Sequence, residues 1–313
     1  MPGNNPLNGP DANGQCHPKF CMSVDVEDYF QVWAFSDVIP KSSWGGFALR
    51  VGETTRRILD LFDETQTKAT FFSLAWVAER DPGLIREIVQ RGHELASHGL
   101  DHAKTFDQTP QEFFIDVDRS KRTLEDITGT EIRGFRAPGF SFDARTPWAY
   151  EMLEKAGYVY SSSSHPIAHD HYGDPDGQRT PYRNGNILEV PVATAEMFGR
   201  RVSAAGGGWF RASPYELSKR LMIQAREQLS GPVVFYFHPW EIDPDQPRIA
   251  SASVKSKLRH YLNLNRMPRK LRRLLSDSDV LNGQRWSRID DAIGVSAPPR
   301  SESQALSTAG EFV

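Results

Sequence analysis

Two histidines four positions apart, His98 and His102, are the side chains of this sequence best spaced to bind one metal ion together. Two imidazoles at this spacing can reach the same ion if the segment between them turns like a helix. Most histidine pairs with this spacing bind nothing, so the pair needs support from a third ligand. Two neutral imidazoles and one carboxylate, with positions left open for water, are typical of a catalytic divalent-metal site.

An acidic cluster near the N-terminus offers that third ligand. Asp25, Glu27 and Asp28 lie within four residues and belong to the end of an apolar run that we predict to be a strand. In an extended chain, Asp25 and Glu27 point to the same face. An isolated cluster of this kind is more often a solvated strand end, so its meaning depends on the other candidate residues.

Two further residues stand at the ends of predicted strands. Arg136 precedes Pro138, which rigidifies the exit from its strand, and the guanidinium would orient an acidic side chain of the cluster and lower its pKa. Such an arginine is also common as a surface ion-pair partner. His238 ends the apolar run Val233–His238 and is either a structural histidine or a general acid for a departing amine.

Short apolar runs alternate with helical patterns along the chain, which predicts an α/β fold with a parallel sheet, either a barrel or a doubly wound layer. In both architectures the active site lies at the C-terminal ends of the strands, where all four groups of candidates fall. Residues 161–186 are expected to form a long irregular loop. The strands are predicted over residues 21–26, 69–74, 93–97, 132–136, 187–192 and 233–238, and the helices over 54–63, 82–91, 110–128, 148–156 and 215–229.

The composition narrows the class of partner. With 37 Lys and Arg against 40 Asp and Glu, the net charge of −3 argues against nucleic-acid binding. No apolar run approaches the roughly 18 residues of a spanning helix, so no integral membrane segment is expected. The first residues lack the pattern of a secretory signal, which predicts a cytoplasmic protein, with a position at the inner face of the membrane left open. Cys16 and Cys21 are expected to be reduced and incidental.

The order of these motifs resembles the polysaccharide deacetylases of carbohydrate esterase family 4, which share the NodB homology domain. The resemblance runs from about Phe20 to about Leu275. It is closest to the branch found beside exopolysaccharide and exosortase (PEP-CTERM) gene clusters, on the strings Ser163–Gly173, Gly206–Arg211 and Phe237–Glu241. It implies an α/β fold built as a distorted (β/α) barrel of about seven strands. We therefore expect a disordered leader over residues 1–18, a deacetylase domain with a C-terminal extension over 19–275, and a flexible tail over 276–313.

The resemblance also implies a role for each candidate residue. It makes Asp25 the catalytic base, Arg136 the residue that holds this base, and His238 the general acid. His98 and His102 become metal ligands, with Glu27 favoured over Asp28 as the third ligand because Glu27 shares a face with Asp25. The expected substrate-contacting residues are Pro138, Phe140, Tyr236 and Trp240.

Four positions depart from the family pattern. Val26, Glu27 and Asp28 follow Asp25 where the family has two adjacent aspartates, and Gly99 replaces a serine or threonine. Tyr236 stands where a leucine usually lines the acetate pocket, and an aspartate expected near Ser161 is missing. These departures leave the implied reaction unchanged but do not determine the substrate.

The function implied is metal-dependent removal of N-acetyl groups from an exopolysaccharide or related amino-sugar polymer, with release of acetate. Zinc is the expected metal, with cobalt, nickel and manganese as alternatives. The partner is an N-acetylated glycan, and the oligomeric state is left open. Two alternatives are retained: a cyclic-amide (ureide) hydrolase of the same superfamily and a non-catalytic carbohydrate-binding component.

Overall fold

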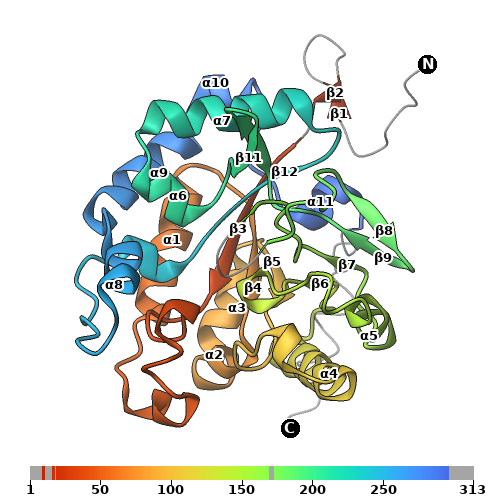
Figure 1. The fold of residues 1–313 in the computed structure, drawn as a ribbon, viewed down its shortest axis with the longest axis vertical. Coiled ribbons are helices and arrows are strands. Elements are labelled where there is room, and N and C mark those ends of the chain that lie inside the picture. The colour runs from red at the N-terminus through yellow and green to blue at the C-terminus, as the bar shows by residue number, and fades with distance from the viewer. Residues whose placement is uncertain (1–8, 11–15, 18, 169–172, 296–313) are drawn as a thin grey trace, which may run out of the picture.

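A curled sheet of eight strands forms the centre of the molecule in a computed structural model, which describes residues 9–10, 16–17, 19–168 and 173–295 (Figure 1). The strand order is β12-β3-β4-β5-β6-β7-β9-β8, and every neighbouring pair is parallel except β8 with β9. The strands are β3 (Phe20–Val26), β4 (Ala69–Ser73), β5 (Glu94–Ser97), β6 (Gly134–Phe135), β7 (Tyr160–Ser161), β8 (Tyr182–Asn184), β9 (Ile187–Glu189) and β12 (Val233–Phe237).

The two ends of this sheet approach each other. Val192, which follows β9, makes a single parallel bridge to Val234 of β12, and Gly206 makes another to Tyr236. The sheet therefore curls into an incomplete barrel, and the predicted NodB-like α/β fold is confirmed.

Helices cover the outside of the sheet (Figure 1). Their ends carry the expected signals: α3 has Pro82 in its first turn and Asp81 as the cap of Leu84 N–H, and α4 begins with a Thr109–Glu112 capping box and ends at left-handed Gly129. The helices are α1 (Val51–Glu64), α2 (Ala75–Arg80), α3 (Pro82–Gln90), α4 (Pro110–Thr128), α5 (Ala149–Lys155), α6 (Gly207–Ala212), α7 (Tyr215–Gln228), α8 (Val254–Tyr261), α9 (Met267–Leu275), α10 (Ser278–Leu281) and α11 (Ile289–Ile293). The short 3-10 helices are η1 (Trp33–Phe35), η2 (Lys41–Gly46), η3 (Thr105–Asp107), η4 (Pro138–Phe140), η5 (Pro239–Ile242) and η6 (Leu264–Arg266).

Alternation along β3 divides the core into two layers. Phe20, Met22, Val24 and Val26 belong to the apolar cluster shared with the surrounding helices. Cys21 belongs to a separate cluster that contains residues from β4, β5, β7, β12 and α11. Because successive side chains of a strand point to opposite faces, Ser23 and Asp25 lie on the same face as Cys21, inside the curl of the sheet.

The predicted tail over residues 276–313 needs correction for residues 276–295. These residues include α10 and α11, and Ile289, Ala292 and Ile293 are buried in the interior cluster with Cys21. Burial of three apolar side chains offsets the entropy of ordering this short segment. The local sequence of the segment does not indicate that it packs inside the sheet. Residues 296–313 lie outside the described part of the chain.

Other elements were not predicted either. Residues 161–186 include β8, which pairs with β9, while residues 169–172 lie outside the described part. Strands β10 (Thr194–Met197) and β11 (Arg200–Ser203) form a separate hairpin. Within the expected leader, β1 (Gly9–Pro10) pairs with β2 (Cys16–His17), and its other residues are not described. No helix of the described residues is both long enough and apolar enough to cross a bilayer.

Candidate active site

Glu27, His98 and His102 converge at the C-terminal edge of the sheet. One ligand atom from each of the three lies within 4.8 Å of the other two. Glu27 follows β3 directly and His98 follows β5 directly, so the parallel pairing of β3, β4 and β5 brings them to the same edge. His102 Nε2 lies 2.7 Å from Glu27 Oε2.

A loop, and not the expected helical turn, brings the two histidines together. Gly99 and His102 both have left-handed backbone conformations, with φ values of 81° and 61°. A side chain at Gly99 would be strained, and its Cβ would lie 3.0 Å from Asp116 Oδ1, which accepts the Leu100 N–H at 2.9 Å. Glycine in place of the usual serine or threonine is therefore explained by the shape of this loop.

The donor set fits a divalent cation. His98 Nδ1 donates to the carbonyl oxygen of Arg136 at 2.9 Å, which leaves the Nε2 lone pair for a metal. Burial lowers the pKa of His98 to about 4, so this imidazole is neutral at physiological pH. Glu27 Oε2 is buried, and its partner among the described residues is His102 Nε2 at 2.7 Å. Two imidazole nitrogens and a carboxylate oxygen gathered this closely are a donor set that a divalent cation can bind.

Asp28 does not take part in this cluster, which corrects its expected role as an alternative ligand. Its carboxylate accepts the backbone N–H groups of Tyr29, Arg50 and Val51 at 2.9, 2.7 and 2.9 Å. Asp28 therefore satisfies donors at the start of α1, where a carboxylate is favoured.

Asp25 and Arg136 form a buried ion pair beside the three ligands. Arg136 is fully buried, and its Nη1 donates to Asp25 Oδ1 at 2.7 Å. The guanidinium also donates to Ser23 and to the carbonyl and hydroxyl oxygens of Ser162, at 2.8–3.0 Å, and it stacks on Phe72 at 4.0 Å. These contacts hold Asp25 Oδ1, while its Oδ2 lies 3.8 Å from His238 Nε2.

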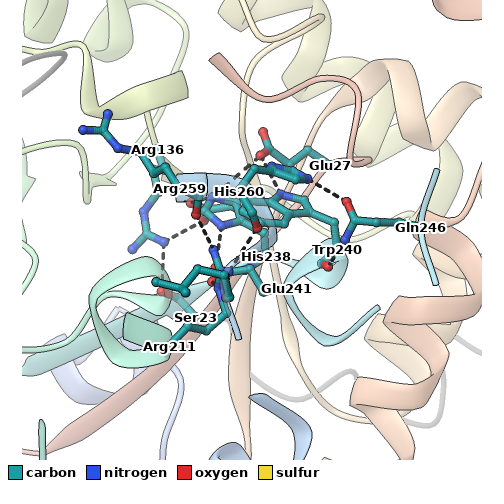
Figure 2. Close-up of polar contacts among 12 residues, drawn as sticks. Ser23, Glu27, Arg136, Arg211, His238, Trp240, Glu241, Gln246, Arg259 and His260 are labelled. Atoms are coloured by element: carbon teal, nitrogen blue, oxygen red, sulfur yellow. Dashed lines mark hydrogen bonds and ion pairs between the residues drawn. The ribbon is translucent and has the colours of Figure 1, made fainter. Parts of the chain in front are cut away.

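His238 stands between carboxylates on both of its ring nitrogens. Its Nε2 lies 3.7 Å from Glu27 Oε1, and its Nδ1 donates to Glu241 Oε1 at 2.9 Å (Figure 2). Burial lowers the pKa of His238, but the charges of Glu27, Glu241 and Asp25 outweigh it and raise the pKa to about 9. Burial likewise raises the pKa of Glu27, but the His102 and His238 imidazoles outweigh it and lower the pKa to about 2. His238 thus carries a proton at neutral pH.

Glu241 and Arg211 were not predicted as site residues. Arg211 Nε donates to Glu241 Oε2 at 2.6 Å, and both side chains are buried (Figure 2). Arg211 Nη1 also donates to the carbonyl oxygens of His260 and Leu262 at 3.0 and 2.5 Å. A Cβ at Gly207 would lie 2.2 Å from Glu241 Oε1, so glycine is required there. The His-Pro-Trp-Glu spacing, in which an acid three residues after a histidine closes a turn over a proline, was the available signal for Glu241.

The acids and histidines of the site line a cavity of about 170 Å³, together with Arg211. Phe140 and Tyr236 lie on its wall with their ring centroids 4.7 Å apart, and their contact with substrate stays a prediction. Pro138 is buried and is not among the lining residues, so its expected substrate contact needs correction. A larger hollow of about 650 Å³ lies between α7 and the β10–β11 hairpin, and no histidine lines it.

Trp240 lines the cavity too. Its ring stacks between His238 and His260, with centroids at 5.1 and 4.1 Å, and its Nε1 donates to Glu27 Oε1 at 3.3 Å (Figure 2). Both faces of the indole are covered, so a sugar can meet only its edge. The cavity lining also includes residues that were not predicted: Val32, Trp33, Ala34, Gly139, Gly208, Arg211, Glu241, Arg259 and His260.

Comparisons with known proteins relate part of this chain to polysaccharide deacetylases. Residues 42–161 match the polysaccharide deacetylase family, and residues 162–293 match a family described as a domain of unknown function, DUF3473. The Gibberella zeae peptidoglycan deacetylase-like protein FGM2 is 32% identical over 168 residues, which cover 51% of this chain and 47% of that protein. A Helicobacter pylori peptidoglycan deacetylase is 31% identical over 140 residues, covering 45% of this chain and 43% of that protein.

Solved structures share the fold. A Mycobacterium smegmatis protein described as a putative polysaccharide deacetylase superposes with a TM-score of 0.57 at 19% identity, covering 94% of this chain and 99% of that chain. Puue allantoinase superposes with a TM-score of 0.57 at 16% identity, covering 94% and 97%. The sequence matches to curated relatives are shorter: this chain covers 47% and 43% of the length of the two relatives named above.

Proposed function

We propose that this protein hydrolyses N-acetyl groups of an amino-sugar polymer and releases acetate. The observation that carries the proposal is the convergence of three metal-ligand side chains, a buried carboxylate and a protonated histidine on one cavity. The relatives described as peptidoglycan deacetylases support the same reaction class.

Glu27, His98 and His102 would hold a divalent metal, with zinc favoured by two imidazoles and one carboxylate, and cobalt, nickel or manganese as alternatives. When bound, the metal would supply a Lewis acid that activates water and polarises the acetamide carbonyl. The neutral state of His98 favours this ligand set because a protonated imidazole cannot coordinate.

Asp25 would accept the proton of the attacking water. Arg136 fixes Oδ1 of this carboxylate, so Oδ2 is the oxygen left to act as the base. The rigid pairing keeps the acceptor in place during the reaction, which avoids the cost of reorganising it.

His238 would donate a proton to the departing amine. Its Nε2 faces the cavity side of Asp25 and Glu27, while Glu241 holds Nδ1 and so fixes the ring orientation. In the metal-free site the pKa of His238 is raised to about 9. Glu241 and Asp25, which are not metal ligands, would still favour the proton on His238 when a cation offsets the charge of Glu27.

We further propose that the polymer is an exopolysaccharide and that the protein works in the cytoplasm or at the inner face of the membrane. The strings Gly206–Arg211 and Phe237–Glu241, on which the resemblance to the exopolysaccharide-associated branch rests, form α6 and η5 beside the cavity. A second candidate is hydrolysis of a cyclic amide, since Puue allantoinase superposes as well as the mycobacterial deacetylase does.

The test is acetate release from N-acetylglucosamine oligosaccharides by the full chain, before metal removal, after it, and after zinc is restored. Activity that survives complete metal removal would refute the mechanism. His98→Ala should lose both bound zinc and activity, whereas Asp101→Asn, in the same loop but ion-paired with Lys41 outside the cluster, should keep both. Turnover of allantoin without acetate release would favour the cyclic-amide alternative.

A further inference from the structure

A line of exposed apolar side chains runs along α8. Val254 is 82% exposed, Leu258 is 64% exposed and Leu262, at the end of the helix, is 36% exposed. Val254 and Leu258, four residues apart, lie on one side of the helix, and Leu262 is the extended residue that directly follows its last turn. Helix α8 lies at the outer edge of the molecule, on the left of Figure 1.

The opposite side of α8 is anchored, so this orientation is fixed. His260 is 2% exposed, stacks on Trp240 at 4.1 Å, and its Nε2 lies 2.6 Å from Gln246 Oε1. Ser253 caps the helix by accepting the Ser256 N–H at 3.1 Å. The apolar line therefore faces outward, because the opposite face of α8 packs against the rest of the protein.

Cations flank this line on both sides. With successive residues about 100° apart around a helix, Lys255 and Arg259 fall on one flank and Lys257 on the other. The surrounding segment, residues 246–276, contains nine Lys and Arg and no Asp or Glu, although the whole chain has a net charge of −3. Several of these cations, the flanking ones included, also have contacts within the protein: Lys257 Nζ donates to the carbonyl oxygen of Ala250 at 2.7 Å, and Arg272 pairs with Glu64.

We propose that α8 docks on the surface of a bilayer that contains anionic lipids. Val254, Leu258 and Leu262 would enter the boundary between headgroups and acyl chains, and the flanking cations would meet lipid phosphates, as in interfacial amphipathic helices. A nucleic acid or an acidic glycan would use the cations but not the apolar line. The absence of acidic residues over residues 246–276 complements the negative surface potential of such a bilayer.

Helix α8 also borders the candidate active site. Arg259 and His260 line the cavity that contains Glu27 and His238, so docking through the outer face of α8 would hold this site close to the membrane without covering it. This surface proposal does not depend on the proposed chemistry, because it concerns residues outside the metal cluster.

The test is co-sedimentation of the full chain with vesicles of phosphatidylcholine, with and without one third phosphatidylglycerol, at low and half-molar salt. We expect binding to the anionic vesicles that falls with salt. Val254→Ser/Leu258→Ser should weaken it about tenfold or more, and Lys255→Glu/Lys257→Glu should do the same. Both pairs are exposed or partly exposed, so the fold should be preserved, which thermal unfolding can verify.

Matched controls are Ile115→Ser, an apolar residue 55% exposed on α4, and Arg119→Glu/Arg122→Glu on the same helix. These variants should bind like the unchanged protein. The proposal is overturned by absence of binding to anionic vesicles at low salt. It is also overturned if charge reversal abolishes binding while the apolar substitutions leave it unchanged, since that pattern shows attraction by charge alone, without insertion of the apolar line.

Discussion

Replacing Glu241 by Gln is the sharpest test of how His238 is controlled. The change keeps the size of the side chain but removes the negative charge that accepts the His238 Nδ1 proton at 2.9 Å. It also leaves the buried Arg211 without its counter-charge, and that cation then disfavours a protonated His238. Both consequences lower the pKa of His238.

The magnitude follows from the number of charges around the ring. The pKa of His238 is about 9, against 6.5 for an unperturbed imidazole, and Glu241 is one of three carboxylates that raise it. Removing one of the three is expected to lower this pKa by about one unit, and more if the unpaired Arg211 stays buried. In the proposed mechanism the protonated form of His238 is the active acid, so the alkaline limb of the profile of kcat against pH should move to lower pH by a similar amount. With the ring less well held, kcat should also fall about tenfold to a hundredfold.

The assay is acetate release by the zinc-loaded protein across a pH series, together with NMR titration of the His238 ring. Glu94→Gln is the matched control, because Glu94 is also buried but does not line the cavity, and its profile should stay unchanged. An E241Q protein that is folded yet keeps its alkaline limb and its His238 titration would refute the reasoning. A loss of activity with no pH shift would assign Glu241 a purely structural role.

Three further predictions concern the ion pair, the interior carboxylate and the C-terminal helix. Arg136→Met should lower the free energy of unfolding by about 3–5 kcal/mol in urea titrations, because it leaves Asp25 buried and uncompensated; an unchanged midpoint would contradict this. The pKa of Glu94 is raised to about 8 by burial and by a neighbouring carboxylate, so the folded state keeps a proton that the unfolded chain loses above 4.5. The contribution of this group to the free energy of unfolding should therefore be complete below pH 4.5 and should be lost as the pH rises through about 8. Glu94→Gln should flatten that decline in unfolding curves measured across the pH series. Ile289→Ala, in the segment expected to be a tail, should cost about 2–5 kcal/mol by the same measurement, whereas a true tail would show no loss.

The sequence by itself determined which strands carry the chemistry. Asp25, His98 and His238 each stand at the end of an apolar run, and all parallel strands in such a fold end at the same edge. Periodicity and capping signals predicted most helices of the first half, for example α3 and α4. These signals are local, so they can be read without knowledge of the fold.

The choice between Glu27 and Asp28 needed the tertiary structure. Both acids follow β3, and what separates them is the start of α1 more than twenty residues later, whose N–H groups bind Asp28 and leave Glu27 for the cluster. The pairing of Glu241 with Arg211 spans thirty residues and arises only when α6 packs beside β12.

The corrections for residues 276–295 and for Pro138 also depend on contacts between distant segments. Ile289 becomes a core residue because the interior of the curled sheet has space for it, and no local pattern encodes that space. Of the two residues predicted in this motif, Phe140 lines the cavity and Pro138 does not. Tertiary structure decided these points because each depends on which distant segment satisfies a buried group, and that choice belongs to the folded chain as a whole.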